Sequence, residues 1–118
     1  MQDYSLGAIE ARFADIVWEN APMSTAQLVK ICEKELDWKR TTTYTVLKKL
    51  SQRGLFENNN GTVNVVMSRE EFYSRQSNSY VETSFGGSLP SFLAAFTAGK
   101  KLSDKEIEEI RKIIDDNR

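Results

Sequence analysis

The sequence has 118 residues, which is enough for one ordinary domain or for a small domain with an appendage. Hydrophobic residues make up 40% and charged residues 28%, a balance that is typical of a soluble globular protein and excludes a disordered chain. The net charge is −1, but it is unevenly spread: residues 38–56 hold five basic residues and no acidic one, whereas residues 1–37 hold three basic and seven acidic residues.

Two helices are predicted at the start of the chain. Apolar residues recur at helical spacing over residues 5–20, and Pro22 ends this helix because proline disfavours helix in the residue before it. Ser24, followed three residues later by Gln27, forms the pattern of a capping box. The capping box predicts a second helix that runs to about residue 36.

A third helix follows a short connection over residues 37–40. Thr41 or Thr42 is its expected N-cap, and Gly54 is well suited to end it as the residue after the C-cap. A helical projection predicts which of its residues face the core. These residues are Thr43, Val46, Leu47 and Leu50.

After Gly54 the pattern changes from helical to β. Residues 55–57 and 62–67 are strand-like, and residues 58–61 (Asn-Asn-Asn-Gly) indicate a turn because asparagine and glycine tolerate positive φ. Three helices followed by a hairpin is the element order of a winged helix-turn-helix. We therefore predict a mostly α fold with a small β-hairpin wing.

Three further helices are expected after the hairpin. Capping boxes at Ser68–Glu71 and Ser103–Glu106 open the first and the last of them, and Gly86-Gly87 breaks the first. Between them, Pro90 lies in the first turn of a short helix that ends at Gly99.

These C-terminal helices carry more apolar side chains than a helical extension of about 40 residues can bury by itself. We therefore divide the chain into a winged helix-turn-helix DNA-binding domain over residues 1–75 and a helical dimerisation domain over residues 76–118. The expected assembly is a two-fold homodimer, and the alternative is that the C-terminal helices pack back on the winged-helix domain. The expected dimerisation residues are Phe85, Leu89, Phe92, Leu93, Phe96, Ile107, Ile110 and Ile113.

The basic window falls on the third helix, which a helix-turn-helix protein places in the major groove of DNA. We expect its hydroxyl-bearing residues Thr42, Tyr44 and Thr45 to contact base edges, and its basic residues to contact mainly phosphates. The complete set of candidate DNA-binding residues is Lys39, Arg40, Thr41, Thr42, Tyr44, Thr45, Lys48 and Lys49.

Each of these assignments has a structural alternative. Charges on a helix usually form a solvated face, and the run of threonines, Thr41 above all, can serve only as a cap. Tyr44 can be a surface aromatic residue that covers the second helix. The wing tip has no lysine or arginine, so its amide groups would make any DNA contact, and a plain surface turn explains it equally well.

Catalysis is not expected from this composition. The chain has no histidine and no glycine-rich phosphate loop, and its single cysteine, Cys32, fits a small buried thiol. We expect no cofactor and no metal site. The main alternative to a DNA-binding repressor is a winged-helix protein-interaction module, whose binding to duplex DNA would not depend steeply on salt.

We also expect a cytoplasmic protein that does not enter a membrane. No run of about 18 apolar residues is present, and the N-terminus lacks the charged-then-apolar pattern of a signal peptide.

A series of short segments with a specific order and spacing runs through nearly the whole chain. They are Leu6–Glu10, Val17-Trp18, Ser24–Leu28, Trp38, Thr42–Leu50, Arg53–Leu55, Phe85–Ser88, Ala94–Phe96, Leu102-Ser103 and Glu106–Ile110. In this order they resemble the penicillinase repressor family (BlaI/MecI/CopY type). The resemblance implies an N-terminal winged helix, a C-terminal dimerisation domain and repression through a palindromic operator in double-stranded DNA.

The resemblance also implies a way to relieve repression. In relatives that respond to β-lactams, a membrane sensor-protease pathway inactivates the repressor by cleavage in the dimerisation domain. The matching bond here is Ala95–Phe96, with alanine where those relatives usually have asparagine. The cysteine-rich metal site of the copper-responsive branch has no counterpart in this sequence.

Two departures from the family pattern concern the operator. Lys39-Arg40 stands where the family tends to have Ser-Pro, and the wing has asparagines where the family tends to have an arginine or an aromatic residue. The operator sequence of the relatives is therefore not expected to apply to this chain.

Overall fold

The computed structural model describes residues 5–118. The chain divides into two compact units, one that extends through Ser79 and one from Tyr80 to Arg118. Helix α4 (Arg69–Phe85) contributes residues to both units.

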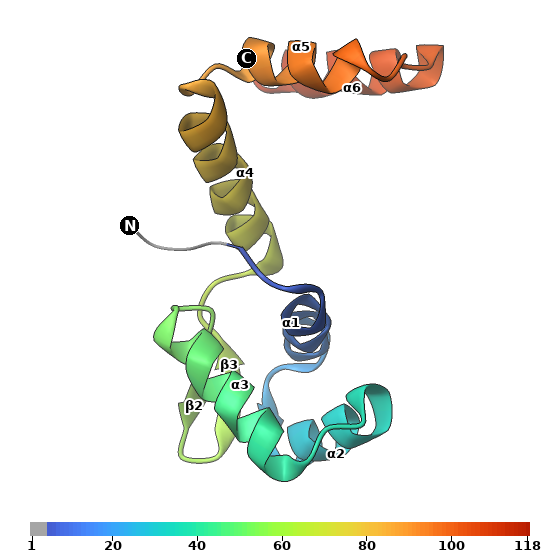
Figure 1. The fold of residues 1–118 in the computed structure, drawn as a ribbon. Helices are drawn as coiled ribbons and strands as arrows, with labels where there is room; N and C mark the ends of the chain where they lie inside the picture. The colour runs from blue at the N-terminus through green and yellow to red at the C-terminus, as the bar shows by residue number, and fades with distance from the viewer. Residues whose placement is uncertain (1–4) are drawn as a thin grey trace. The chain divides into compact units, whose positions relative to one another are not determined.

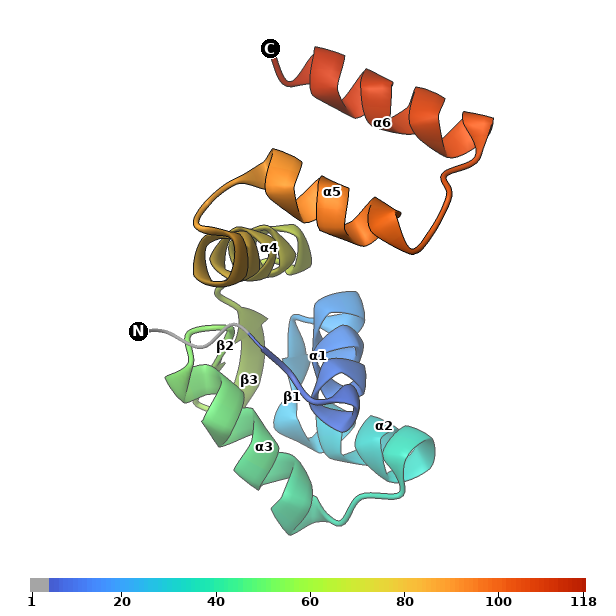
Figure 2. The ribbon, with the colours of Figure 1, turned by 45° about the horizontal axis from the view of Figure 1, so that its top comes forward.

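The N-terminal unit consists of three helices and a small antiparallel sheet, followed by the first turns of α4 (Figures 1 and 2). The elements before α4 are α1 (Ala8–Asn20), β1 (Met23–Ser24), α2 (Thr25–Leu36), α3 (Arg40–Gln52), β2 (Phe56–Asn59) and β3 (Thr62–Val65). The strand order is β1-β3-β2, so β3 is the central strand. The predicted winged-helix fold is confirmed.

Strand β1 was missed by the sequence analysis. Met23 pairs with Val63 and Ser24 with Thr62, both in antiparallel register. Two residues are too few to show the alternation that marks a strand, and the pairing depends on a segment about 40 residues further along the chain. The next residue, Thr25, donates its backbone N–H to the carbonyl of Gly61 at 3.0 Å and so fixes the wing to the start of α2.

Two predicted helix starts are wrong by a few residues. Helix α1 begins at Ala8 and not at Ser5, because the backbone N–H of Gly7 bonds back to the Glu10 carboxylate at 3.2 Å and places Gly7 in the N-cap position. Helix α3 begins at Arg40, and Lys39 is its N-cap without a side-chain bond, so neither candidate threonine caps it.

The other end of α3 confirms the prediction for Gly54. This glycine has a φ of 85°. Its N–H bonds to the carbonyl of Ser51 at 3.0 Å, and the N–H of Leu55 bonds to the carbonyl of Leu50 at 3.1 Å. This pair of bonds is a Schellman motif, and it turns the chain from α3 into the hairpin.

The hairpin turn is shorter than predicted. Only Asn60 and Gly61 lie outside the strands, with φ values of 52° and 89°, as a tight two-residue turn requires. Asn58 and Asn59 belong to β2, where they pair with residues of β3.

One apolar core joins the helices to the sheet. Phe13, Phe56 and Phe72 are its largest fully buried side chains among the described residues. Both tryptophans pack against this core: the Trp38 ring stacks on Phe13 at 5.6 Å, and the Trp18 indole N–H donates to the carbonyl of Met67 at 3.0 Å.

The C-terminal unit consists of the last turns of α4 and of α5 (Leu89–Ala98) and α6 (Asp104–Asp116), which Figure 2 shows as separate helices. The predicted capping box of α6 is confirmed, since Ser103 and Glu106 exchange two side-chain-to-backbone hydrogen bonds of 3.1 Å. Between Tyr80 and Arg118 no side chain is fully buried. In residues 5–118 no helix has the length and apolar character needed to span a bilayer.

Candidate nucleic-acid interface

Helix α3 carries the basic window, and its inner face is held firmly by the core. Thr43, Leu47 and Leu50 are at most 2% exposed, and Val46 packs against the core from the side. These are the four residues that the helical projection placed inward. The Cys32 thiol on α2 is also buried, as predicted; burial raises its pKa and a hydrogen bond with Thr43 partly opposes this.

The outward face of α3 is polar and basic. Thr41, Thr45 and Lys48 are exposed and follow one another at four- and three-residue spacing, so their side chains form one stripe along the helix. Gln52 continues the stripe one turn later, and Thr42 lies exposed beside it. Gln52 was missed by the sequence analysis, although its position four residues after Lys48 indicates the same face.

The hydroxyl groups on this face differ in what they can still bind. Thr45 donates its hydroxyl hydrogen to the carbonyl of Thr41 at 2.8 Å, which leaves its methyl group and the lone pairs of its oxygen for a ligand. Within residues 5–118 the hydroxyls of Thr41 and Thr42 form no hydrogen bond, so they remain able to donate or accept.

Tyr44 links α3 to the start of α2. Its side chain is partly buried, and a hydrogen bond between its hydroxyl and Thr25 is the largest cause that lowers its pKa, with Arg40 adding to the effect. The Arg40 guanidinium lies over the Tyr44 ring, 5.5 Å from its centroid. This placement matches the alternative in which Tyr44 covers the second helix.

The basic side chains fall into two groups. Lys39, Arg40 and Lys48 are exposed, and none of them has a carboxylate at ion-pair distance in the described part of the chain. Lys49, in contrast, lies with its Nζ 2.8 Å from Oε2 of Glu10, and this contact is the main cause that lowers the pKa of Glu10. Lys49 therefore joins α3 to α1, and Arg53, after the end of α3, donates to the carbonyl of Ser5 at 2.6 Å. Three positive charges without a carboxylate partner remain on α3 and its N-cap.

The wing presents polar and uncharged groups at its tip. Asn59 and Asn60 are exposed, while the Asn58 carboxamide accepts a hydrogen bond from the backbone of Gly61 at 3.0 Å. The tip thus offers two carboxamides for a contact and no basic side chain.

The expected dimerisation residues lie on the helices of the C-terminal unit, and an aromatic cluster lies at their centre. The ring of Phe92 is within 6.1 Å of those of Tyr80, Phe85 and Phe96. The other expected residues, Leu89, Leu93, Ile107, Ile110 and Ile113, are half-buried or exposed. Ile113 is 68% exposed, and the neighbouring Ile114, which was not in the predicted set, is 50% exposed.

The candidate cleavage bond lies inside a helix. Ala95 and Phe96 both belong to α5, Ala95 is exposed, and Phe96 is half exposed with the Lys100 ammonium 5.8 Å from its ring centroid. Across residues 5–118 no group of three or more histidine, cysteine, aspartate or glutamate side chains could hold a metal ion.

Comparisons with known proteins agree over nearly the whole chain. The sequence is 24% identical over 113 residues to the penicillinase repressor of Bacillus licheniformis, with 92% of this chain and 88% of the relative covered. It is 21% identical over 115 residues to the methicillin resistance regulatory protein MecI of Staphylococcus aureus, with 94% of each chain covered. The sequence model of the penicillinase repressor family matches residues 6–116, and the chain therefore belongs to this family.

Proposed function

We propose that this protein is a transcriptional repressor that binds operator DNA through α3 as a homodimer. The observation that carries the proposal is the outward face of α3, where exposed hydroxyls lie beside three uncompensated cations in a chain whose net charge is −1. Membership of the penicillinase repressor family supports the regulatory role. Positive charge concentrated on one helix attracts a polyanion even where the whole molecule is slightly acidic.

In this proposal α3 enters the major groove with its first turns leading. Thr42 and Thr45 contact base edges: the Thr42 hydroxyl can donate or accept, the Thr45 hydroxyl can accept, and either methyl group fits the methyl group of thymine. Tyr44 reaches bases with its ring edge while its hydroxyl stays at Thr25. Lys39, Arg40 and Lys48 contact phosphates, and Thr41 and Gln52 extend the same surface.

The C-terminal unit supports the homodimer. A single chain leaves every side chain from Tyr80 to Arg118 at least partly exposed, including the aromatic cluster and the isoleucines of α6. A second copy would bury this apolar surface, and removal of apolar area from water favours association. A two-fold dimer would also present two copies of α3 to the two halves of a palindromic operator.

We further propose that cleavage of the Ala95–Phe96 bond by a sensor-protease pathway relieves repression. A protease binds an extended segment, so α5 must unwind locally before the bond can be cut. Cleavage would remove residues 96–118, which include four of the eight expected dimerisation residues.

A chain that ends at Ala95 should therefore be monomeric. Compared with the full-length protein, its affinity for paired half-sites should fall far more than its affinity for a single half-site. Retention of the dimer by this shorter chain would contradict the proposed role of the bond.

Selection of bound duplexes from a random library tests the function directly. The full-length protein should enrich a palindromic motif with two half-sites. T45A and Y44A should change which bases are preferred, whereas K48A should weaken binding to all sequences and leave the motif unchanged. Failure to enrich any motif at low ionic strength would overturn the proposal. Equal effects of all three variants on motif and random DNA would overturn the assignment of roles.

A further inference from the structure

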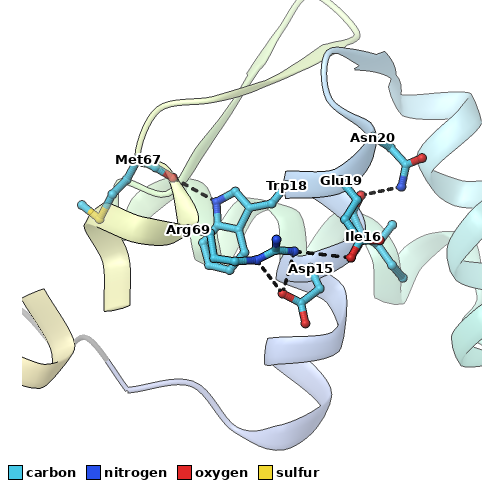
Figure 3. A network of polar contacts seen from close by, with 7 residues as sticks. All are labelled: Asp15, Ile16, Trp18, Glu19, Asn20, Met67 and Arg69. Carbon is cyan, nitrogen blue, oxygen red and sulfur yellow. Dashed lines mark hydrogen bonds and ion pairs between the residues drawn. The ribbon is translucent and has the colours of Figure 1, made fainter. Parts of the chain in front are cut away.

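Arg69, the first residue of α4, is held by three residues of α1 (Figure 3). Its guanidinium lies 3.1 Å from Oδ1 of Asp15 and 3.4 Å from Oε1 of Glu19. The same guanidinium lies over the Trp18 ring, 5.5 Å from its centroid. One side chain thus makes two ion pairs and a cation–π contact with residues at least 50 positions earlier in the chain.

The surrounding residues fix the same junction. The Trp18 indole N–H donates to the carbonyl of Met67 at 3.0 Å, two residues before α4 begins. The Trp18 ring also contacts the rings of Phe72 and Tyr73 at 5.9 and 6.0 Å, and Phe72 is fully buried. The start of α4 is therefore packed on α1 around the Trp18 ring, with Arg69 as its charged contact.

We propose that Arg69 is a positioning residue for DNA recognition: it fixes the direction in which α4 leaves the winged-helix unit and thereby sets the spacing of half-sites that the dimer accepts. This inference rests on the proposed function. Helix α4 is the segment through which the chain continues from the unit with α3 to the C-terminal unit. A firm first turn of α4 limits how far two copies of α3 in a dimer can move relative to each other.

Half-site spacing is the property that reports this role. Two recognition helices fit two half-sites when the half-sites face the same side of the duplex, about one helical turn or 10 base pairs apart. A stiff connection between the two readers gives a large gain in affinity at one spacing and little at others, whereas a loose connection gives a smaller gain over a wider range. A residue that only stabilised the fold would lower affinity at every spacing by the same factor.

The test measures binding of the full-length dimer to a series of duplexes that carry the selected half-site twice, with the spacing changed by one base pair at a time. The wild type should prefer its best spacing by about tenfold over spacings changed by two base pairs. R69A and D15N should reduce this preference to about threefold or less, and binding to a single half-site should stay within about twofold of the wild type. R69K, which keeps the charge but loses the planar fork, should retain part of the preference.

Arg75 provides a matched control, since its guanidinium pairs at 2.7 Å with Glu71 on α4 itself. R75A should keep the spacing profile of the wild type. The inference is overturned if R69A, shown to be folded by circular dichroism, keeps the wild-type profile or changes it no more than R75A does. Absence of duplex binding by the wild type would overturn the proposed function, whereas binding of the wild type at all spacings alike would overturn only the role of Arg69.

Discussion

Lys48 and Lys49 are neighbours on α3, and both side chains are exposed, but only Lys49 has a carboxylate partner, at 2.8 Å. A lysine that already neutralises Glu10 gains less from a phosphate than one that faces solvent alone. We therefore expect K48A to weaken binding to all duplexes and to make the negative slope of log K against log salt shallower by about one per protomer. K49A should change this slope by less than half as much. Fluorescence anisotropy over a salt series measures both slopes. Equal slope changes for the two variants would show that the ion pair with Glu10 opens on DNA.

The same ion pair predicts a pH dependence of stability. Contact with Lys49, the hydrogen bond from Gly7 and nearby positive charge hold the pKa of Glu10 below its ordinary value of 4.5. A carboxyl group whose pKa is lowered by folding contributes stability above its unfolded pKa, and this contribution is lost as the pH falls through the folded pKa. The wild type should thus be more stable than E10Q at pH 6 to 7, and the difference should shrink below about pH 4.5.

Urea unfolding of the two proteins from pH 7 to pH 3 measures this difference. E33Q is a suitable control, because Glu33 is exposed on α2 and makes no ion pair in the described part of the chain, so its stability difference from the wild type should not depend on pH in this way. A constant difference between the wild type and E10Q over the whole range would contradict the assigned contact.

At the level of the elements, the turn of the wing requires a left-handed backbone conformation. Gly61 has a φ of 89°, and a Cβ added there would meet no atom within 4 Å, so a substitution is opposed by backbone strain and not by crowding. We expect G61A to lower the free energy of unfolding by about 1 to 2 kcal/mol. G99A is the matched control, since a Cβ added at Gly99 would also meet no atom within 4 Å, but the φ of Gly99 is −106° and suits any residue.

The free energies of unfolding of both variants come from urea titrations. G99A should lie within about 0.5 kcal/mol of the wild type. A similar loss in both variants would show that the turn residue has no special role.

Elements defined by local signals could be predicted from the sequence. The capping boxes at Ser24 and Ser103, the end of α3 at Gly54 and the inward residues of α3 each depend on residues within a few positions. Features that depend on distant segments could not be predicted. Strand β1 exists because β3 pairs with it, and the N-cap position of Lys39 has no side-chain bond that a sequence pattern could indicate.

The same distinction applies to the candidate site. The exposed face of α3 follows from helical periodicity, so most of its residues could be found from the sequence. The partners of its side chains could not, because Lys49 meets Glu10 on α1 and Tyr44 meets Thr25 on α2 through tertiary packing. These contacts decide which charges remain for a ligand.

At the scale of the molecule, the two units differ in how much they bury. The N-terminal unit has its own core, whereas no side chain from Tyr80 to Arg118 is fully buried in a single chain. We expect the wild type to be a dimer at micromolar concentration and I113D to shift it toward the monomer, because a charge would enter an apolar interface.

Light scattering after size exclusion measures both masses. K112A, at the exposed neighbouring position on α6, should remain a dimer. A monomeric wild type, or an I113D variant that dimerises as tightly as the wild type, would contradict the proposed interface.

In the proposed function, α3 binds the DNA backbone with its uncompensated cations. The most direct test is the affinity of the full-length protein for its selected duplex from 50 to 200 mM salt. Three cations on each of two protomers predict about six phosphate contacts, a slope of log K against log salt near −5 and a loss of affinity of about a thousandfold. An affinity that stays nearly constant over this range would contradict the claim and favour a winged helix that binds protein partners.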